Sequence, residues 1–110
     1  MLRRILIKKF SNKIKIKWPN DLLFEKKKIC GILQETVFNA GKKFLIIGIG
    51  INTNLDPKNT SFSSTSLKQI TNKNIDNKKL FTTIKKNYEK FLFKANQNSF
   101  SKLKKFTQKI

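Results

Sequence analysis

The chain has 110 residues, a single cysteine, no histidine and a formal charge of +19. This length predicts one domain, and a mean hydropathy of −0.44 indicates a modest core. Cys30 alone excludes an internal disulfide and a cysteine-based zinc cluster, and the lack of histidine excludes Ser-His and Cys-His nucleophile systems. No apolar run approaches the ~20 residues of a membrane span, and "MLRRILIKKF" at the start lacks the long apolar region of a signal peptide. We therefore expect a cytoplasmic protein without a membrane partner.

The high positive charge is a weak argument for a nucleic-acid partner. Apart from Arg3 and Arg4 every basic residue is lysine, and the lysines are scattered along the chain. A genome rich in A and T would produce the same abundance of Lys, Asn, Ile and Phe, whereas base readout usually relies on arginine. We expect no specific nucleic-acid partner, although the charge would attract an anionic small substrate.

The front of the chain, residues 12–54, is predicted to be rich in strands. Ile14 and Ile16 alternate with lysines, which is the period of a half-buried strand. Pro19 cannot donate to a strand ladder, so this strand should end before it.

Two more strands are predicted at residues 29–37 and 44–52. Between them, "NAGKK" at residues 39–43 predicts a hairpin turn in which Gly41 takes a positive φ.

Residues 55–64 are predicted to form a loop and residues 65–110 to be helical. A short helix is expected at residues 65–70, and Asp76 is expected to cap a long amphipathic helix. The inward-facing residues predicted for the long helix are Leu80, Ile84, Tyr88, Phe91 and Ala95, with Phe81 and Leu92 beside them. A last helix is expected to begin at Ser99 and to turn Leu103 and Phe106 inward. The chain is thus predicted to be one α+β domain, a mainly antiparallel sheet packed by C-terminal helices.

The third predicted strand, "FLIIGIGIN", has two different faces. Its isoleucines at 47, 49 and 51 share one face, whereas Gly48, Gly50 and Asn52 share the other. Glycine inside a strand usually marks a close approach to the backbone, either by a ligand or by a crossing helix. A flat ligand laid across the bare face would suit this pattern, but a tight helix crossing explains the strand alone nearly as well.

Neighbouring strands would bring polar groups to the same surface. Gly31 belongs to the second strand, just past Lys28, and Lys17, Asn20 and Asp21 lie on the far side of the hairpin. If the strands are adjacent, two cations, an amide and a carboxylate lie beside bare backbone, which suits a nucleotide phosphate and oxygen-ligated Mg²⁺.

Three blocks in this order resemble the second half of the catalytic domain of biotin protein ligases. They are "KWPND" at 17–21, "KKICGILQE" at 27–35 and "IGIGINTN" at 47–54, and "STSL" at 64–67 continues the likeness. The resemblance implies a two-step ligase. Biotin's carboxylate attacks the α-phosphorus of ATP with Mg²⁺ to give biotinyl-AMP. A lysine on the biotin carboxyl carrier protein of acetyl-CoA carboxylase then takes the biotinyl group.

The resemblance also assigns roles to residues. Lys28 matches the lysine that contacts the biotin carboxylate and the adenylate phosphate, and Asp21 matches the carboxylate that orients the incoming amine. Lys17 and Asn20 match the phosphate and metal side, with Asn20 as a candidate Mg²⁺ ligand. The other matched substrate- or nucleotide-binding positions are Trp18, Gly31, Leu33, Gly48, Gly50 and Asn52. Cys30 takes the place of a small residue and is expected to pack.

The chain departs from the family before residue 14. A glycine- and arginine-rich loop precedes these blocks in the family, whereas Arg3 and Arg4 have no glycine beside them. We therefore expect residues 1–110 to form a partial catalytic domain, from a shortened gene or a late start, or else a split protein that needs a separate N-terminal half. Two alternatives remain, a lipoate–protein ligase-like enzyme and a non-catalytic binding module with a basic surface.

Overall fold

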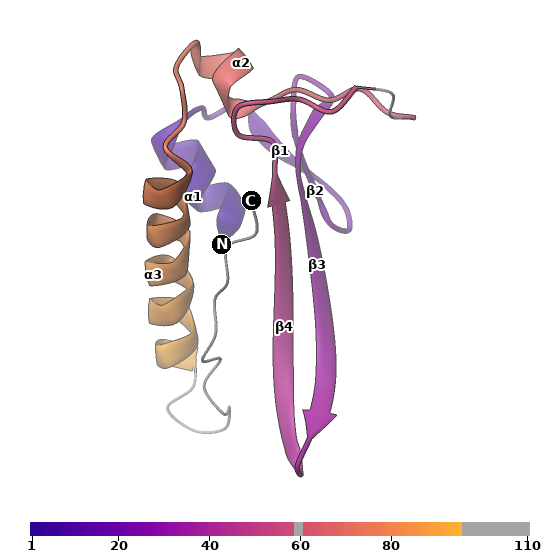
Figure 1. The fold of residues 1–110 in the computed structure, drawn as a ribbon, viewed down its shortest axis with the longest axis vertical. Helices are drawn as coiled ribbons and strands as arrows, with labels where there is room; N and C mark the ends of the chain where they lie inside the picture. The colour runs from indigo at the N-terminus through magenta and orange to yellow at the C-terminus, as the bar shows by residue number, and fades with distance from the viewer. Residues whose placement is uncertain (59–60, 96–110) are drawn as a thin grey trace.

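The computed structural model describes residues 1–58 and 61–95, and its central feature is a four-stranded antiparallel sheet. The strands are β1 (Ile14–Lys17), β2 (Asp21–Phe24), β3 (Lys27–Asn39) and β4 (Lys42–Ile51). They follow one another across the sheet in chain order, and β3 and β4 extend as a long hairpin beyond the two short strands (Figure 1). Together with the helices, this confirms the predicted α+β class.

Two hairpins are closed by two-residue turns in which both residues have positive φ. At the end of the long hairpin, Ala40 and Gly41 have φ of 52° and 75°, so the predicted turn and its glycine conformation are confirmed. Glu25 and Lys26, between β2 and β3, have φ of 49° and 65°. Positive φ at both turn positions matches the twist of a hairpin, but in a sequence such a turn is usually recognised by glycine or asparagine at these positions. Because neither occurs at 25 or 26, the sequence did not predict β2.

Three helices complete the described chain: α1 (Leu2–Lys9), α2 (Leu67–Thr71) and α3 (Asn77–Ala95). The Ser66 hydroxyl accepts a bond from the Gln69 N–H at 3.1 Å, and the Asp76 carboxylate accepts one from the Lys79 N–H, also at 3.1 Å. These bonds satisfy free N–H groups at the helix starts, so the predicted cap at Asp76 is confirmed. Helix α1 was not predicted.

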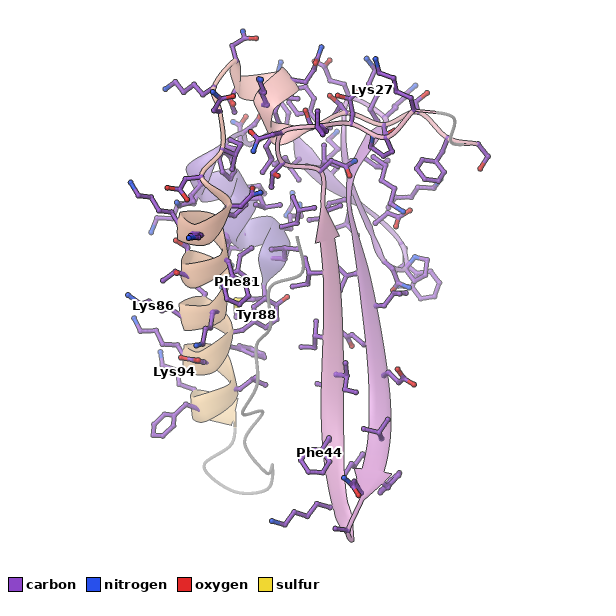
Figure 2. All side chains as sticks on the ribbon, viewed as in Figure 1. Lys27, Phe44, Phe81, Lys86, Tyr88 and Lys94 are labelled. Carbon is purple, nitrogen blue, oxygen red and sulfur yellow. The ribbon has the colours of Figure 1, made fainter. Side chains whose placement is uncertain are left out.

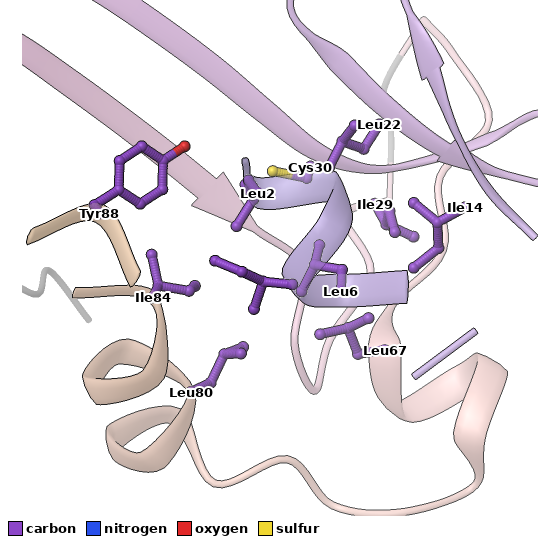
Figure 3. Packing of buried hydrophobic residues seen from close by; sticks show 11 residues of the cluster. Leu2, Leu6, Ile14, Leu22, Ile29, Cys30, Leu67, Leu80, Ile84 and Tyr88 are labelled. Atoms are coloured by element: carbon purple, nitrogen blue, oxygen red, sulfur yellow. The ribbon is translucent and has the colours of Figure 1, made fainter. Parts of the chain in front are cut away.

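The hydrophobic core lies between one face of the sheet and the helices. In Figure 3, Leu2 and Leu6 of α1 lie among side chains from the sheet, from α2 and from α3. The buried core residues of these other elements are Ile14, Leu22, Ile29, Cys30, Leu67, Leu80, Ile84 and Tyr88. Figure 2 shows Phe81 and Tyr88 on the side of α3 that faces the sheet and Lys86 on its outer side. Helices therefore cover one face of the sheet.

Two predicted buried positions are wrong. Ile16 is exposed because β1 is an edge strand and α1 covers only its first residue, where the Arg3 guanidinium donates to the Ile14 carbonyl at 3.1 Å. Phe91 is exposed because the buried row of α3 follows a four-residue spacing, which reaches Leu92 after Tyr88.

Some sequence predictions lie outside the described residues. They are the side chain of Ala95 and the last helix with Ser99, Leu103 and Phe106. Within residues 1–58 and 61–95, no helix combines the length and the apolarity needed to cross a membrane.

Replacing Leu6 by alanine tests whether α1 belongs to the core. Leu6 is completely buried, so Leu6→Ala should lower the free energy of unfolding by roughly 2–5 kcal/mol in urea denaturation. Ile7→Ala, at the half-buried next position, is the matched control and should cost clearly less. Equal losses from the two variants would contradict this packing.

Candidate functional site

A row of four residues crosses the sheet on the face away from the core. Lys17 of β1 pairs with Asp21 of β2, Asp21 pairs with Gly31 of β3, and Gly31 pairs with Gly50 of β4. Directly paired residues of antiparallel strands point to the same face. The register therefore brings a lysine, a carboxylate and two glycines onto one surface, as the sequence predicted for their placement.

A β-bulge adds Lys28 to the same surface. Leu22 pairs with Cys30 but Leu23 pairs with Lys28, so Ile29 is an extra residue without a partner in β2. Ile29 and Cys30 are both buried in the core, although they are consecutive residues of one strand. Strict alternation would turn Lys28 to the core side with Cys30. The bulge reverses this, as bulges next to sites commonly do, and turns Lys28 outward.

The Lys28 ammonium lies between Asp21 and the bare backbone of Gly31. Its nitrogen is 3.2 Å from a carboxylate oxygen of Asp21, and the two side chains are 28% and 31% exposed. A Cβ on Gly31 would lie 3.3 Å from that nitrogen and 3.7 Å from the same carboxylate oxygen. A partly desolvated ion pair is stronger than one in open water, and the glycine leaves the space that the lysine occupies.

Residues 62–65, in the loop between β4 and α2, lie along the backbone of Lys28 on the side away from β2. The Lys28 N–H donates to the Ser63 carbonyl and the Thr65 N–H donates to the Lys28 carbonyl, both at 2.9 Å. Asn52 holds this arrangement, because its amide donates to the Thr65 carbonyl at 3.1 Å and to the Lys28 carbonyl at 3.4 Å. The ring of Phe62 then lies with its centroid 4.8 Å from the Lys28 nitrogen.

Beyond this cluster, the outward face of β3 and β4 is open. No described atom lies within 4 Å of a Cβ built on Gly50, and a Cβ on Gly48 would meet only Leu33 at 3.8–3.9 Å. Leu33 itself pairs with Gly48 and is 71% exposed. The glycines therefore do not lie beneath a described helix. This favours a bound ligand over a crossing helix as the explanation of the glycine pattern.

The remaining predicted positions lie at the turn between β1 and β2. Trp18 is strongly exposed, and the Asn20 carbonyl accepts a bond from the Ile32 N–H at 2.8 Å while its side chain is exposed. In the described part of the chain no three His, Cys, Asp or Glu side chains form a group that could hold a metal. Asn20 and Asp21 offer one amide and one carboxylate, which fits Mg²⁺ held mainly by water and phosphate.

Cys30 lies behind the row, on the core side of the sheet. Burial is the main cause that raises the pKa of its thiol to about 12, with Lys28 lowering and Asp21 raising it. A thiol with so high a pKa is protonated at neutral pH and is a poor nucleophile. Burial agrees with the predicted packing role.

The structure adds two functional candidates that the sequence did not identify. Phe62 contacts the Lys28 ammonium, and Ile29 is the bulge residue that turns Lys28 outward. A phenylalanine in a loop carries no local sequence signal. Two consecutive apolar residues directly after a lysine run indicate that side chains stop alternating between the two faces of the strand. Only the pairing register shows that Ile29 is the extra residue.

Known proteins resemble this chain in sequence and in fold. The Biotin/lipoate A/B protein ligase family matches residues 4–52, which include β1 to β4. The bifunctional ligase/repressor BirA of Bacillus subtilis is 42% identical over 66 residues, which cover 56% of this chain. The biotin protein ligase of Aquifex aeolicus, in complex with biotin and ATP, superimposes with a TM-score of 0.69 at 33% identity over 90% of this chain.

The chain is thus similar to biotin protein ligases in sequence and in fold. Biotin protein ligase 2 of Arabidopsis thaliana, 36% identical over 53 residues, is a further relative. The Leishmania major biotin protein ligase in complex with biotinyl-5-AMP, at 22% identity and a TM-score of 0.65, shares the fold. The chain spans 20% of the length of the Bacillus subtilis protein and 42% of the Aquifex aeolicus chain.

Alkylation of Cys30 tests its burial. At pH 8.5 the folded thiol should react with iodoacetamide about a thousand-fold more slowly than in urea, because its pKa is raised from 9.0 to about 12. Since the folded pKa is the higher one, the thiol's contribution to stability is complete below pH 9 and is lost as the pH rises toward 12. The free energy of unfolding should therefore fall more steeply above pH 9 in the wild type than in Cys30→Ala. Fast alkylation of the folded chain would contradict the assignment.

Proposed function

We propose that this chain carries the adenylate-binding part of a biotin protein ligase. The proposed reaction activates biotin with ATP to biotinyl-AMP and transfers the biotinyl group to a lysine of a biotin carboxyl carrier protein. The observation that carries the proposal is the Lys28 ammonium held beside Asp21 over the bare backbone of Gly31. A cation in this position suits an acyl phosphate laid on the glycine face.

The first step makes one bond and breaks one. A biotin carboxylate oxygen attacks the α-phosphorus of ATP, and pyrophosphate leaves with the bonding electrons. Negative charge develops on the phosphoryl oxygens, and a preorganised cation lowers the free energy of that transition state. Lys28 supplies this cation in the proposal. Lys17, at the β1 end of the row of paired residues that crosses the sheet, supplies a second positive charge near the phosphates. Asn20 would help to hold Mg²⁺, which would neutralise charge on the phosphates of ATP.

The second step transfers the acyl group. The amine of the acceptor lysine attacks the biotinyl carbonyl, AMP leaves, and the amine loses a proton. Asp21 lies beside Lys28 on the open face, where its carboxylate can orient the incoming amine. Asn52 acts indirectly in the proposal, because its side-chain amide donates hydrogen bonds to the backbone carbonyls of Lys28 and Thr65 and so helps to hold Lys28 in place.

The open face fits the acyl part of the ligand. Gly48 and Gly50 leave bare backbone, and the exposed Leu33 adds an apolar side chain next to them. Biotin has an apolar valeryl chain and a compact bicyclic ring system with a flat ureido ring, which suit such a floor. Lipoic acid also has an apolar chain, so the lipoate alternative is tested by titrating a lipoyl-adenylate analogue beside the biotinyl one.

Removing the Lys28 ammonium tests the proposed function. We expect a non-hydrolysable biotinyl-adenylate analogue to perturb the amide NMR resonances of residues 17–33 and 48–52 in the wild type. Lys28→Ala should weaken its binding about 10- to 100-fold, because a hydrogen bond between charged groups is lost. Lys15→Ala, an exposed lysine on the same strand as Lys17, is the matched control and should bind normally.

The same titration separates the alternatives. Tighter binding of the lipoyl-adenylate analogue would favour a lipoate ligase. Equal weakening by Lys28→Ala and Lys15→Ala would favour a diffuse basic binding surface. No perturbation by either analogue would refute the proposal.

A valine at position 50 tests whether the bare face is a binding floor. Gly50→Val should fold as stably as the wild type or better, because a Cβ at this position meets no described atom within 4 Å and valine favours strands. Its isopropyl group should nevertheless abolish binding of the biotinyl-adenylate analogue. Gln34→Val, on the opposite face of β3, is the matched control that should still bind. Unimpaired binding by Gly50→Val would exclude this face as the floor.

A further inference from the structure

Long lysine side chains are usually mobile, and Lys28 has contacts that favour one position of its side chain. A lysine loses about 2 kcal/mol of rotamer entropy when its long stem is fixed. Two other ion pairs among the described residues, Lys13–Glu25 at 4.0 Å and Lys85–Glu89 at 3.9 Å, are longer and more exposed. Neither is expected to fix its lysine.

The Lys28 ammonium has contacts on three sides. The Asp21 carboxylate lies 3.2 Å away, the bare α-carbon of Gly31 lies beneath it, and the Phe62 ring centroid lies 4.8 Å away. A cation within about 6 Å of an aromatic face is attracted by the negative face of the ring. The carboxylate alone would allow the ammonium to swing about it, and the ring restricts that movement.

The position of Phe62 is fixed by the backbone of the lysine that it contacts. Residues 63 and 65 bond to the N–H and the carbonyl of Lys28, and Ser64 forms a parallel bridge with it. Phe62 is the residue directly before this clamp, and it is 47% exposed.

We propose that Phe62 is a positioning residue for Lys28. Its ring and the Asp21 carboxylate together hold the ammonium over Gly31, where it meets an anionic acyl-phosphate ligand. This inference rests on the proposed function for the identity of the ligand. It assigns Phe62 no contact with the reacting atoms.

The contact itself is tested by NMR without any ligand. The side-chain εCH₂ protons of Lys28 should resonate upfield of those of the other lysines, because they are next to an ammonium nitrogen that lies 4.8 Å from the centroid of an aromatic ring. Phe62→Leu should remove the upfield shift and Phe62→Tyr should keep it. Phe38→Leu, an exposed phenylalanine near the turn of the long hairpin, is the matched control and should leave the shift unchanged.

The consequence is tested by titration with the biotinyl-adenylate analogue. Phe62→Leu should weaken binding about three-fold, as expected for an exposed cation–π contact, whereas Phe62→Tyr and Phe38→Leu should bind as the wild type does. An absent upfield shift in the wild type, or equal binding by Phe62→Leu, overturns the inference and leaves the proposed function standing. If the shift is present but neither the wild type nor any variant binds the analogue, the proposed function fails. The contact between Phe62 and Lys28 then exists without the proposed ligand.

Discussion

The extra residue in β3 is the constraint on which the rest of the site depends. Alternation in a strand is strict, so a lysine two residues before the buried Cys30 belongs on the core side. Burying an unpaired ammonium there would cost several kcal/mol. Because Ile29 has no partner in β2, it joins Cys30 in the core, and Lys28 turns to the face where Asp21 and Gly31 lie. One residue thus couples the packing of the core to the placement of the cation.

The sequence predicted the parts of this fold that have local signals. Alternating isoleucines located β1 and β4, a glycine located the tight turn of the long hairpin, and Asp76 located the start of α3. Strand β2 was not predicted, because its turn takes positive φ at Glu25 and Lys26 without glycine or asparagine. Tertiary packing decides such positions, since a hairpin held by neighbouring strands tolerates the cost of roughly 1–2 kcal/mol per residue.

The candidate site was predictable as a set of residues but not as a geometry. The glycine face and the polar groups of residues 17–31 were identifiable from strand periodicity and from the family motifs. The contact of Lys28 with Phe62 was not, because it depends on a loop that pairs in parallel with the start of β3. Helix α1 was not predicted, although Leu2, Ile5 and Leu6 have the spacing of a buried helical stripe. Contacts between residues far apart in the chain cannot be predicted from local sequence patterns.

The strong positive charge and the candidate site are best understood as separate features. The chain has 23 lysines, that is 25 basic residues less two arginines, and most of the described ones are exposed. Exposed lysines are screened by salt and contribute a diffuse potential that attracts any anion. Lys28 differs because its ammonium is partly desolvated and held on three sides, so its interaction with a ligand is directional. Charge alone therefore explains attraction, whereas the proposed selection of an acyl phosphate depends on where the bulge, the carboxylate and the glycine hold one cation.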